Sequence, residues 1–167
     1  MKKEKKNIYY WSTVALLILG LVWIFFAQYG RITLEEHATF VEIRGHRLTV
    51  EVVSDETMRS KGLGGHAPLS DDEGMLFVFP TSEIRTFWMK GMTFPIDIVW
   101  LAGSDPRSLR IVGYEENVDP QMGAQDYELK FYTSSEPVSY VLEVRGGLMR
   151  KFGVLSGDIV AVSFLLK

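Results

Sequence analysis

An uncharged apolar segment, residues 8–30, follows the first lysines and constrains this chain more than any other feature. About 20 apolar residues at about 1.5 Å each are long enough to cross the hydrocarbon core of a bilayer. The segment is apolar on every face, whereas a helix of a soluble domain has a polar face. Aromatic residues stand at both of its ends, which suits the two membrane interfaces. We therefore expect a transmembrane helix with a separate domain after it, and the lipid bilayer as one partner.

Charge on the two sides of this segment predicts its orientation. The 30 N-terminal residues carry four lysines and one glutamate, whereas the rest of the chain carries 14 basic and 20 acidic side chains. Positive residues stay on the cytoplasmic side of a membrane. We expect a single-pass protein of the cytoplasmic membrane, with a cytoplasmic tail (1–7), a signal-anchor helix (8–30), a stalk (31–38) and an exported domain (39–167). The alternative is a cleaved signal peptide, but Tyr29 stands where a cleavage site needs a small residue.

Short strands are predicted throughout the region after the stalk. Alternation of apolar and polar residues, or a short continuous apolar run, is typical of a strand. Such patterns occur at residues 40–43, 48–52, 75–79, 85–90, 96–101, 109–114, 139–144 and 159–165. One short helix is expected to run through Lys61, capped by Ser54 or Asp55, and a second at 148–152. The sequence therefore predicts a mostly β domain, a compact antiparallel barrel-like or sandwich domain with one or two short helices.

Composition excludes several classes of chemistry. Cysteine is absent, which removes disulfides, thiol nucleophiles, cysteine-ligated metals and a lipid attached to cysteine. The net charge of −3 argues against a nucleic-acid binder. His37, His46 and His66 lie far apart and lack metal-binding spacing, and neither a P-loop nor a Gly-x-Ser-x-Gly elbow is present. We therefore expect no metal, no cofactor and no nucleic-acid partner.

Several motifs in a fixed order resemble one known family. They are Arg59 with Gly62-Leu63, then GMLFVFP at 74–80, FWMK at 87–90, PIDIV at 95–99, YVLE at 140–143, Gly146-Gly147, Gly153 and Gly157-Asp158. Together they resemble the domain of unknown function 192 family over roughly residues 40–165. The resemblance implies a compact, mostly β, barrel-like single domain, commonly preceded by a signal or membrane anchor. It implies no established activity.

Two departures from the family pattern concern ligand contacts. Residues 89–92 read Met-Lys-Gly-Met where the family pattern continues Met-Lys-Asn-Thr. Residues 62–66 read Gly-Leu-Gly-Gly-His. In the family pattern a basic residue usually stands shortly after Gly-Leu. If the missing Asn or Thr side chain contacts a ligand in relatives, that contact is altered here. Gly91 can still supply the turn geometry that Asn tolerates.

The candidate site centres on Trp88, Lys90 and Asp97. On a strand Trp88 and Lys90 share one face, and the bend at Pro95 would bring Asp97 back toward Lys90. An indole, an ammonium and a carboxylate together suit a polar or sugar-like ligand. The alternative is a core tryptophan beside a surface Lys90–Asp97 pair, which contributes only about 0–1 kcal/mol.

Asp97 and Glu143 each interrupt an otherwise apolar strand. An inward carboxylate has to be paired or hydrogen-bonded because an isolated buried charge is costly. Arg59, Lys90 and Arg145 are the candidate partners of Asp97. Simple alternation points Glu143 to solvent. If the two carboxylates converge instead, they form a pair capable of acid–base chemistry.

The leading functional hypothesis is a binding protein rather than an enzyme. No recognisable nucleophile, metal cage or cofactor loop accompanies the candidate binding residues, which are Arg59, Trp88, Lys90, Asp97 and Glu143. We expect a ligand- or partner-binding accessory module of the cell envelope, with a small polar or glycan ligand or an envelope protein as partner.

Two other functions remain open. An envelope hydrolase would use Asp97 and Glu143 as acid and base, with the carboxyl groups roughly 5–10 Å apart across an open cleft. An interaction platform would instead use a loop at residues 115–137 to dock another membrane protein. The platform requires a sizeable exposed apolar patch around Tyr127 and its neighbours Phe131 and Tyr132.

Overall fold

The computed structural model of the protein describes residues 39–164. The expected cytoplasmic tail, signal-anchor helix and stalk fall at residues 1–38, outside the described residues, and stay predictions. Within the described part of the chain, no helix has the length and apolar character needed to cross a membrane.

Strands dominate residues 39–164, with two short α-helices and two 3-10 turns between them. The strands are β1 (Thr39–Ile43), β2 (His46–Val53), β3 (Glu73–Glu83), β4 (Thr86–Trp88), β5 (Ile96–Ala102), β6 (Leu109–Val118), β7 (Phe131–Thr133), β8 (Val138–Arg145) and β9 (Ile159–Phe164). The helices are α2 (Glu56–Lys61) and α3 (Leu148–Phe152), and the 3-10 turns are η1 (Pro106–Ser108) and η2 (Asp126–Glu128). The mostly β composition and both short helices are confirmed. The loop predicted at 115–137 is interrupted, because β6 extends to Val118 and η2 and β7 follow.

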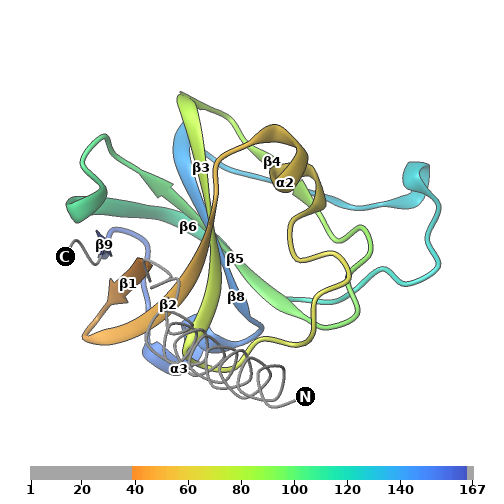
Figure 1. Ribbon diagram of the computed structural model, residues 1–167, viewed down its shortest axis with the longest axis horizontal. Helices are drawn as coiled ribbons and strands as arrows, with labels where there is room; N and C mark the ends of the chain where they lie inside the picture. The colour runs from red at the N-terminus through yellow and green to blue at the C-terminus, as the bar shows by residue number, and fades with distance from the viewer. Residues whose placement is uncertain (1–38, 165–167) are drawn as a thin grey trace, which may run out of the picture. The chain divides into compact units, whose positions relative to one another are not determined.

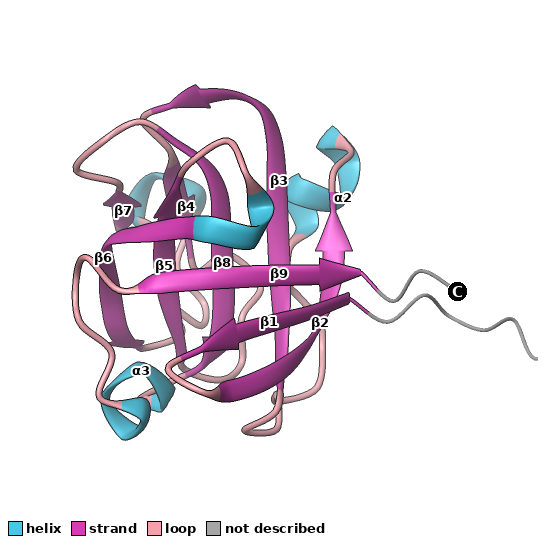
Figure 2. Cartoon of the chain, turned by 90° about the vertical axis from the view of Figure 1, so that its left-hand side faces the viewer, coloured by secondary structure: helices cyan, strands magenta, loops and turns pink. Residues whose placement is uncertain are grey.

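Seven strands close into a barrel in the order β1-β2-β3-β8-β5-β6-β9, and β9 returns to β1 (Figure 1). Figure 2 shows β9 and β1 side by side on the wall that faces the viewer. The barrel-like alternative of the prediction is thus confirmed. Neighbouring barrel strands are antiparallel except β2 and β3, which are parallel. A parallel pair cannot be joined by a tight turn, so residues 54–72, with α2, form the crossover.

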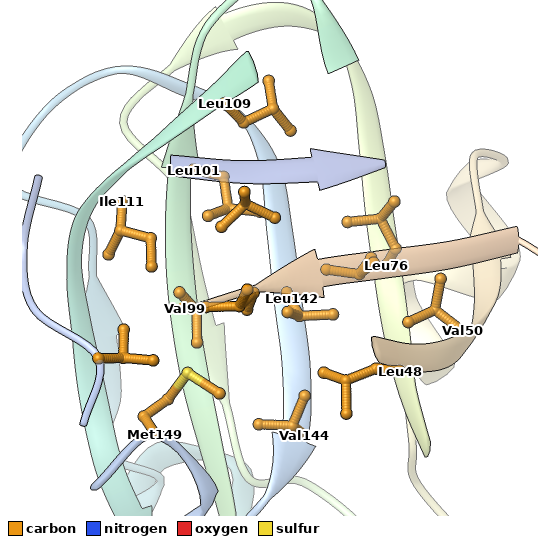
Figure 3. Close-up of a cluster of buried hydrophobic side chains, with 14 of the residues drawn as sticks. Leu48, Val50, Leu76, Val99, Leu101, Leu109, Ile111, Leu142, Val144 and Met149 are labelled. Carbon is orange, nitrogen blue, oxygen red and sulfur yellow. The ribbon is translucent and has the colours of Figure 1, made fainter. Parts of the chain in front are cut away.

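Apolar side chains from alternate strand positions and from α3 fill the barrel interior. Figure 3 labels Leu48, Val50, Leu76, Val99, Leu101, Leu109, Ile111, Leu142, Val144 and Met149 among them, and all are buried. Successive residues of a strand point to opposite faces, so Val99 and Leu101 enter the interior while Ile98 and Trp100 point outward. The closed barrel leaves no free sheet edge among its seven strands.

A second apolar cluster covers the outer face of β3, β5 and β8. The barrel-strand residues on this face include Phe77, Ile98, Trp100 and Val141. The connecting segments add Leu63, Met89, Met92 and Phe94, and β7 adds Tyr132. Because both faces of β5 are buried, its sequence is apolar at every position except Asp97 rather than alternating. This second layer covers Val141 on β8 and the position of Glu143 beside it.

Candidate functional site

A pocket of about 350 Å³ opens on the outer face of the barrel, where α2, β3, β4 and β8 meet. Its lining includes Arg59, Lys61 and Gly62 from α2 and its C-terminal end, Phe77 and Phe79 from β3, Arg85, Phe87, Trp88 and Lys90 from β4 and its flanks, and Glu143 from β8. Four of the five residues singled out in the sequence therefore line one cavity. They are Arg59, Trp88, Lys90 and Glu143.

Glu143 is the buried acid of this pocket. It pairs with Met75 on one side and Ile98 on the other, so its side chain points to the outer face of the sheet. The second apolar layer covers that face, and Glu143 is only 4% exposed rather than directed to solvent as alternation suggested. Its Oε2 has no hydrogen-bond partner in the described part of the chain. Burial raises the pKa of the Glu143 carboxyl to about 8, so the group is a neutral acid at pH 7 and can donate a proton in a hydrogen bond.

Gly62 keeps space open above this carboxyl. Asp55 caps α2 by accepting from the backbone N–H of Met58 at 2.9 Å, as predicted, and the helix ends at Gly62 with φ +51°. A Cβ at residue 62 would lie 3.4 Å from Cζ of Phe77 and 3.9 Å from Oε2 of Glu143. Any larger side chain would fill the pocket at that point, and the positive φ disfavours other residues as well. The C-terminal end of α2 therefore shapes the cavity.

Two arginines form a basic wall around Phe79. The guanidinium carbons of Arg59 and Arg85 lie 5.1 and 4.1 Å from its ring centre. Nη1 of Arg59 donates to the carbonyl oxygens of Ser54 and Val78, and Nη2 of Arg85 donates to the carbonyl oxygen of Thr81 at 2.6 Å. Both side chains are therefore held in place by neutral backbone oxygens and by cation–π contact.

Arg85 was missed in the sequence, although a signal existed. It stands two residues before Phe87, so alternation places both on one face of the strand predicted at 85–90. Its side chain is 17% exposed and forms an ion pair with Glu83 at 3.3 Å. Its Nε is buried without a hydrogen-bond partner in the described chain. Arg85 thus joins Arg59 as a cation directed at the pocket wall.

Trp88 and Lys90 lie at the rim of the pocket. Trp88 is 44% exposed and packs edge-on against Phe131 of β7, with ring centres 5.8 Å apart. Met89 between them is fully buried. The ammonium of Lys90 contacts Asp126 of η2 at 2.7 Å rather than Asp97. The predicted Lys90–Asp97 pair is wrong.

Asp97 has a different role from the other four candidates. Its carboxylate is fully buried and accepts hydrogen bonds from the backbone N–H groups of Asn117, Gly147 and Met149, each at 2.7 Å. Burial raises the pKa of this carboxyl, and the three donors oppose that rise. The predicted cationic partners are wrong, because backbone groups satisfy Asp97 and Arg145 instead contacts Asp71 at 2.8 Å. Asp97 ties β5 to the end of β6 and the start of α3.

The two carboxyl groups do not form an acid–base pair. Asp97 faces Val144 and Glu143 faces Ile98 across the β5–β8 ladder. These are adjacent positions along each strand, so the two side chains point to opposite faces of the sheet. The hydrolase alternative, which needs both groups in one cleft, therefore lacks its geometry.

The surface near β7 is partly apolar. Tyr127 is 85% exposed and Phe131 is 54% exposed, but Tyr132 is buried in the second cluster. Only two of the three residues named for the interaction platform are exposed, so the apolar patch is smaller than that hypothesis expects. Among residues 39–164, no group of three His, Asp or Glu side chains is placed to hold a metal ion.

Comparison with known proteins identifies the family. The chain matches the sequence profile of the DUF192 family, described as "Uncharacterized ACR", over residues 39–162. It belongs to this family. The resemblance drawn from the motifs is confirmed. A comparison with curated proteins finds no match.

Two solved structures share the fold of this DUF192 chain. One is a candidate transcription regulator from Sinorhizobium meliloti 1021, with 30% identity and a TM-score of 0.63 over 75% of this chain and 92% of that one. The other is a protein of unknown function from Novosphingobium aromaticivorans DSM 12444, with 30% identity and a TM-score of 0.62 over 74% of this chain and 82% of that one.

The departure from the DUF192 pattern at residues 91 and 92 now has a structural meaning. Gly91 has φ +72°, the left-handed conformation that both Gly and Asn adopt. Met92 is 5% exposed, belongs to the second apolar cluster and lines the pocket. The Met92 thioether therefore makes this side of the pocket apolar, at a position where the motif resemblance implies a threonine.

Proposed function

We propose that this protein is a membrane-anchored accessory protein of the cell envelope whose barrel domain binds a small polar or glycan ligand in the Glu143 pocket. The observation that carries the proposal is the buried Glu143 carboxyl without a hydrogen-bond partner at an open cavity. Leaving a buried polar group unpaired costs about 1–3 kcal/mol, so native proteins rarely keep one. A ligand hydroxyl or carbonyl in the pocket would satisfy it.

The lining of the pocket supports binding of a polar molecule with an apolar face. Phe79, Phe87 and Trp88 supply aromatic surface, while Arg59, Arg85 and Glu143 supply hydrogen-bond donors. A few polar groups among apolar walls are typical of small-molecule sites, and a volume of about 350 Å³ lies in their range.

Binding is testable with two replacements at one position. In the full chain in detergent micelles, a monosaccharide at 100 times its dissociation constant should stabilise the domain by about 2.7 kcal/mol and raise the Tm by several degrees. Glu143→Gln keeps a donor and should keep this shift, whereas Glu143→Met removes the donor and should lose it. Glu51→Gln, at an exposed carboxyl of β2, is the matched control. A Tm that no monosaccharide moves, or a shift that survives Glu143→Met unchanged, would contradict the proposal.

The proposed envelope location rests on the predicted membrane anchor and its orientation, which have their own test. Alkaline phosphatase fused after Lys167 should be active, because the positive residues before the apolar segment keep the N-terminus in the cytoplasm. The same fusion without residues 1–30 is the control and should be inactive. If alkaline phosphatase is inactive at this position and a reporter that works only in the cytoplasm is active there, the predicted orientation is wrong.

A further inference from the structure

The pocket carries more positive charge than its protein neighbours neutralise. Arg59, Lys61, Arg85 and Lys90 line it, against Glu56 and the neutral acid Glu143. The ion pairs found within residues 39–164 use Lys90 and Arg85 but include neither Arg59 nor Lys61. The excess positive charge favours an anionic ligand.

The guanidiniums of Arg59 and Arg85 both line the pocket and can receive an anion there, although Arg85 also pairs with Glu83 at 3.3 Å. Nη1 of Arg59 is occupied by two carbonyl oxygens, so its charge is hydrogen-bonded but not neutralised. Nε of Arg85 is buried without a partner. A guanidinium fixed by backbone and aromatic contacts loses little side-chain freedom when it binds a planar or tetrahedral anion.

The remaining surface of the pocket suits the uncharged part of such a ligand. Glu143 is a donor for a hydroxyl group, and Trp88 offers exposed indole surface at the rim. Aromatic rings bind the apolar C–H face of a sugar, while hydrogen-bonding groups bind its hydroxyls.

We propose, building on the proposed function, that the pocket selects a sugar ring that carries one anionic group. Arg59 and Arg85 hold the anion, and Glu143 donates a hydrogen bond to a ring hydroxyl. The anion is a carboxylate or a phosphate, and both share the oxygen geometry that a guanidinium binds through two parallel hydrogen bonds.

The test compares glucose with three sugars that each differ from it at a single carbon. Glucose, glucuronate, glucose 6-phosphate and glucosamine share the ring, and calorimetric titration of the full chain in detergent micelles gives a Kd for each. Glucuronate or glucose 6-phosphate should bind at least about tenfold more tightly than glucose, with glucosamine the weakest. Whichever of the two anions binds more tightly identifies the preferred group. High salt should reduce the preference because it screens charge.

Two arginine variants distinguish binding of the anion by Arg59 from a general effect of losing one positive charge. Arg59→Gln should bring the Kd for the anionic sugar close to that for glucose. Arg47→Gln is the matched control, because the Arg47 guanidinium lies 3.6 Å from the ring centre of Phe40 and does not line the pocket. It should leave all four Kd values unchanged.

The outcomes distinguish this inference from the function on which it rests. If glucose binds as tightly as both anionic sugars, the anion selectivity is wrong while ligand binding stands. An anion preference that survives in Arg59→Gln would also overturn the assignment. If none of the four sugars binds the wild-type chain, both proposals fail.

Discussion

Replacing Asp97 with alanine should lower the free energy of unfolding by about 3–5 kcal/mol, the largest effect we expect from a single substitution in this protein. The carboxylate accepts three backbone N–H groups, and each buried donor left without an acceptor costs about 1–3 kcal/mol. The costs do not add fully, because the loops at Asn117 and Gly147 can shift and admit water. Urea unfolding of the full chain at pH 7, compared with wild type, gives the value.

The intermediate variant makes this prediction sharper. Oδ1 of Asp97 accepts from Asn117 and Gly147, whereas Oδ2 accepts from Met149. In Asp97→Asn one side-chain oxygen remains as an acceptor. The other oxygen is replaced by an NH2 group, which faces a backbone N–H that also needs an acceptor. The free energy of unfolding of Asp97→Asn should therefore lie between those of wild type and Asp97→Ala. Asp119→Ala, on the exposed loop after β6, is the control. A cost below about 1 kcal/mol for Asp97→Ala would contradict the structural role of this carboxylate.

The stability of wild type relative to Glu143→Gln should fall as pH rises from 4.5 toward 8. The folded protein holds the proton of Glu143 up to a pKa of about 8, whereas the unfolded chain releases it near the ordinary value of 4.5. Deprotonation in this range therefore favours the unfolded state, with a slope of about 1.4 kcal/mol per pH unit. Below pH 4.5 both states are protonated and the difference is constant. Above pH 8 wild type should be less stable than the variant by on the order of a few kcal/mol.

Comparison with the glutamine variant isolates this one group. All other carboxyl and amino groups titrate equally in both proteins, so their effects cancel in the difference. Urea unfolding at pH 5, 7 and 9 is sufficient to define the slope. Parallel stability curves for the two proteins would show that Glu143 is ionised at neutral pH in the folded state.

Local patterns predicted most of the strands and both helices. Alternation identified β1, β2 and β8, and Asp55 and Gly62 bounded α2, because these signals depend only on neighbouring residues. The parallel pairing of β2 with β3 was not predictable in this way. It depends on how far the crossover at residues 54–72 carries the chain, which no local pattern encodes.

Most residues of the candidate site could be predicted from the sequence, but the role of each residue could not. Trp88 and Lys90 were found because alternation places them on one face of a strand, and Glu143 was found because it interrupts an apolar strand. The second apolar layer, built from connecting segments, buries Glu143 and cannot be inferred from the alternation of β8 alone. Asp97 interrupted its strand for a different reason, since its partners are backbone N–H groups that no sequence motif displays.

Glu143 acts, in this proposal, as a neutral acid that donates a hydrogen bond to a ligand in an open pocket. Infrared difference spectroscopy of the full chain at pH 7, wild type minus Glu143→Gln, observes this group directly through the C=O stretch of a protonated carboxyl. We predict that the band is present in wild type, is absent from the variant and shifts when glucuronate is added. Absence of the band in wild type, or a band that none of the four sugars moves, would contradict the account.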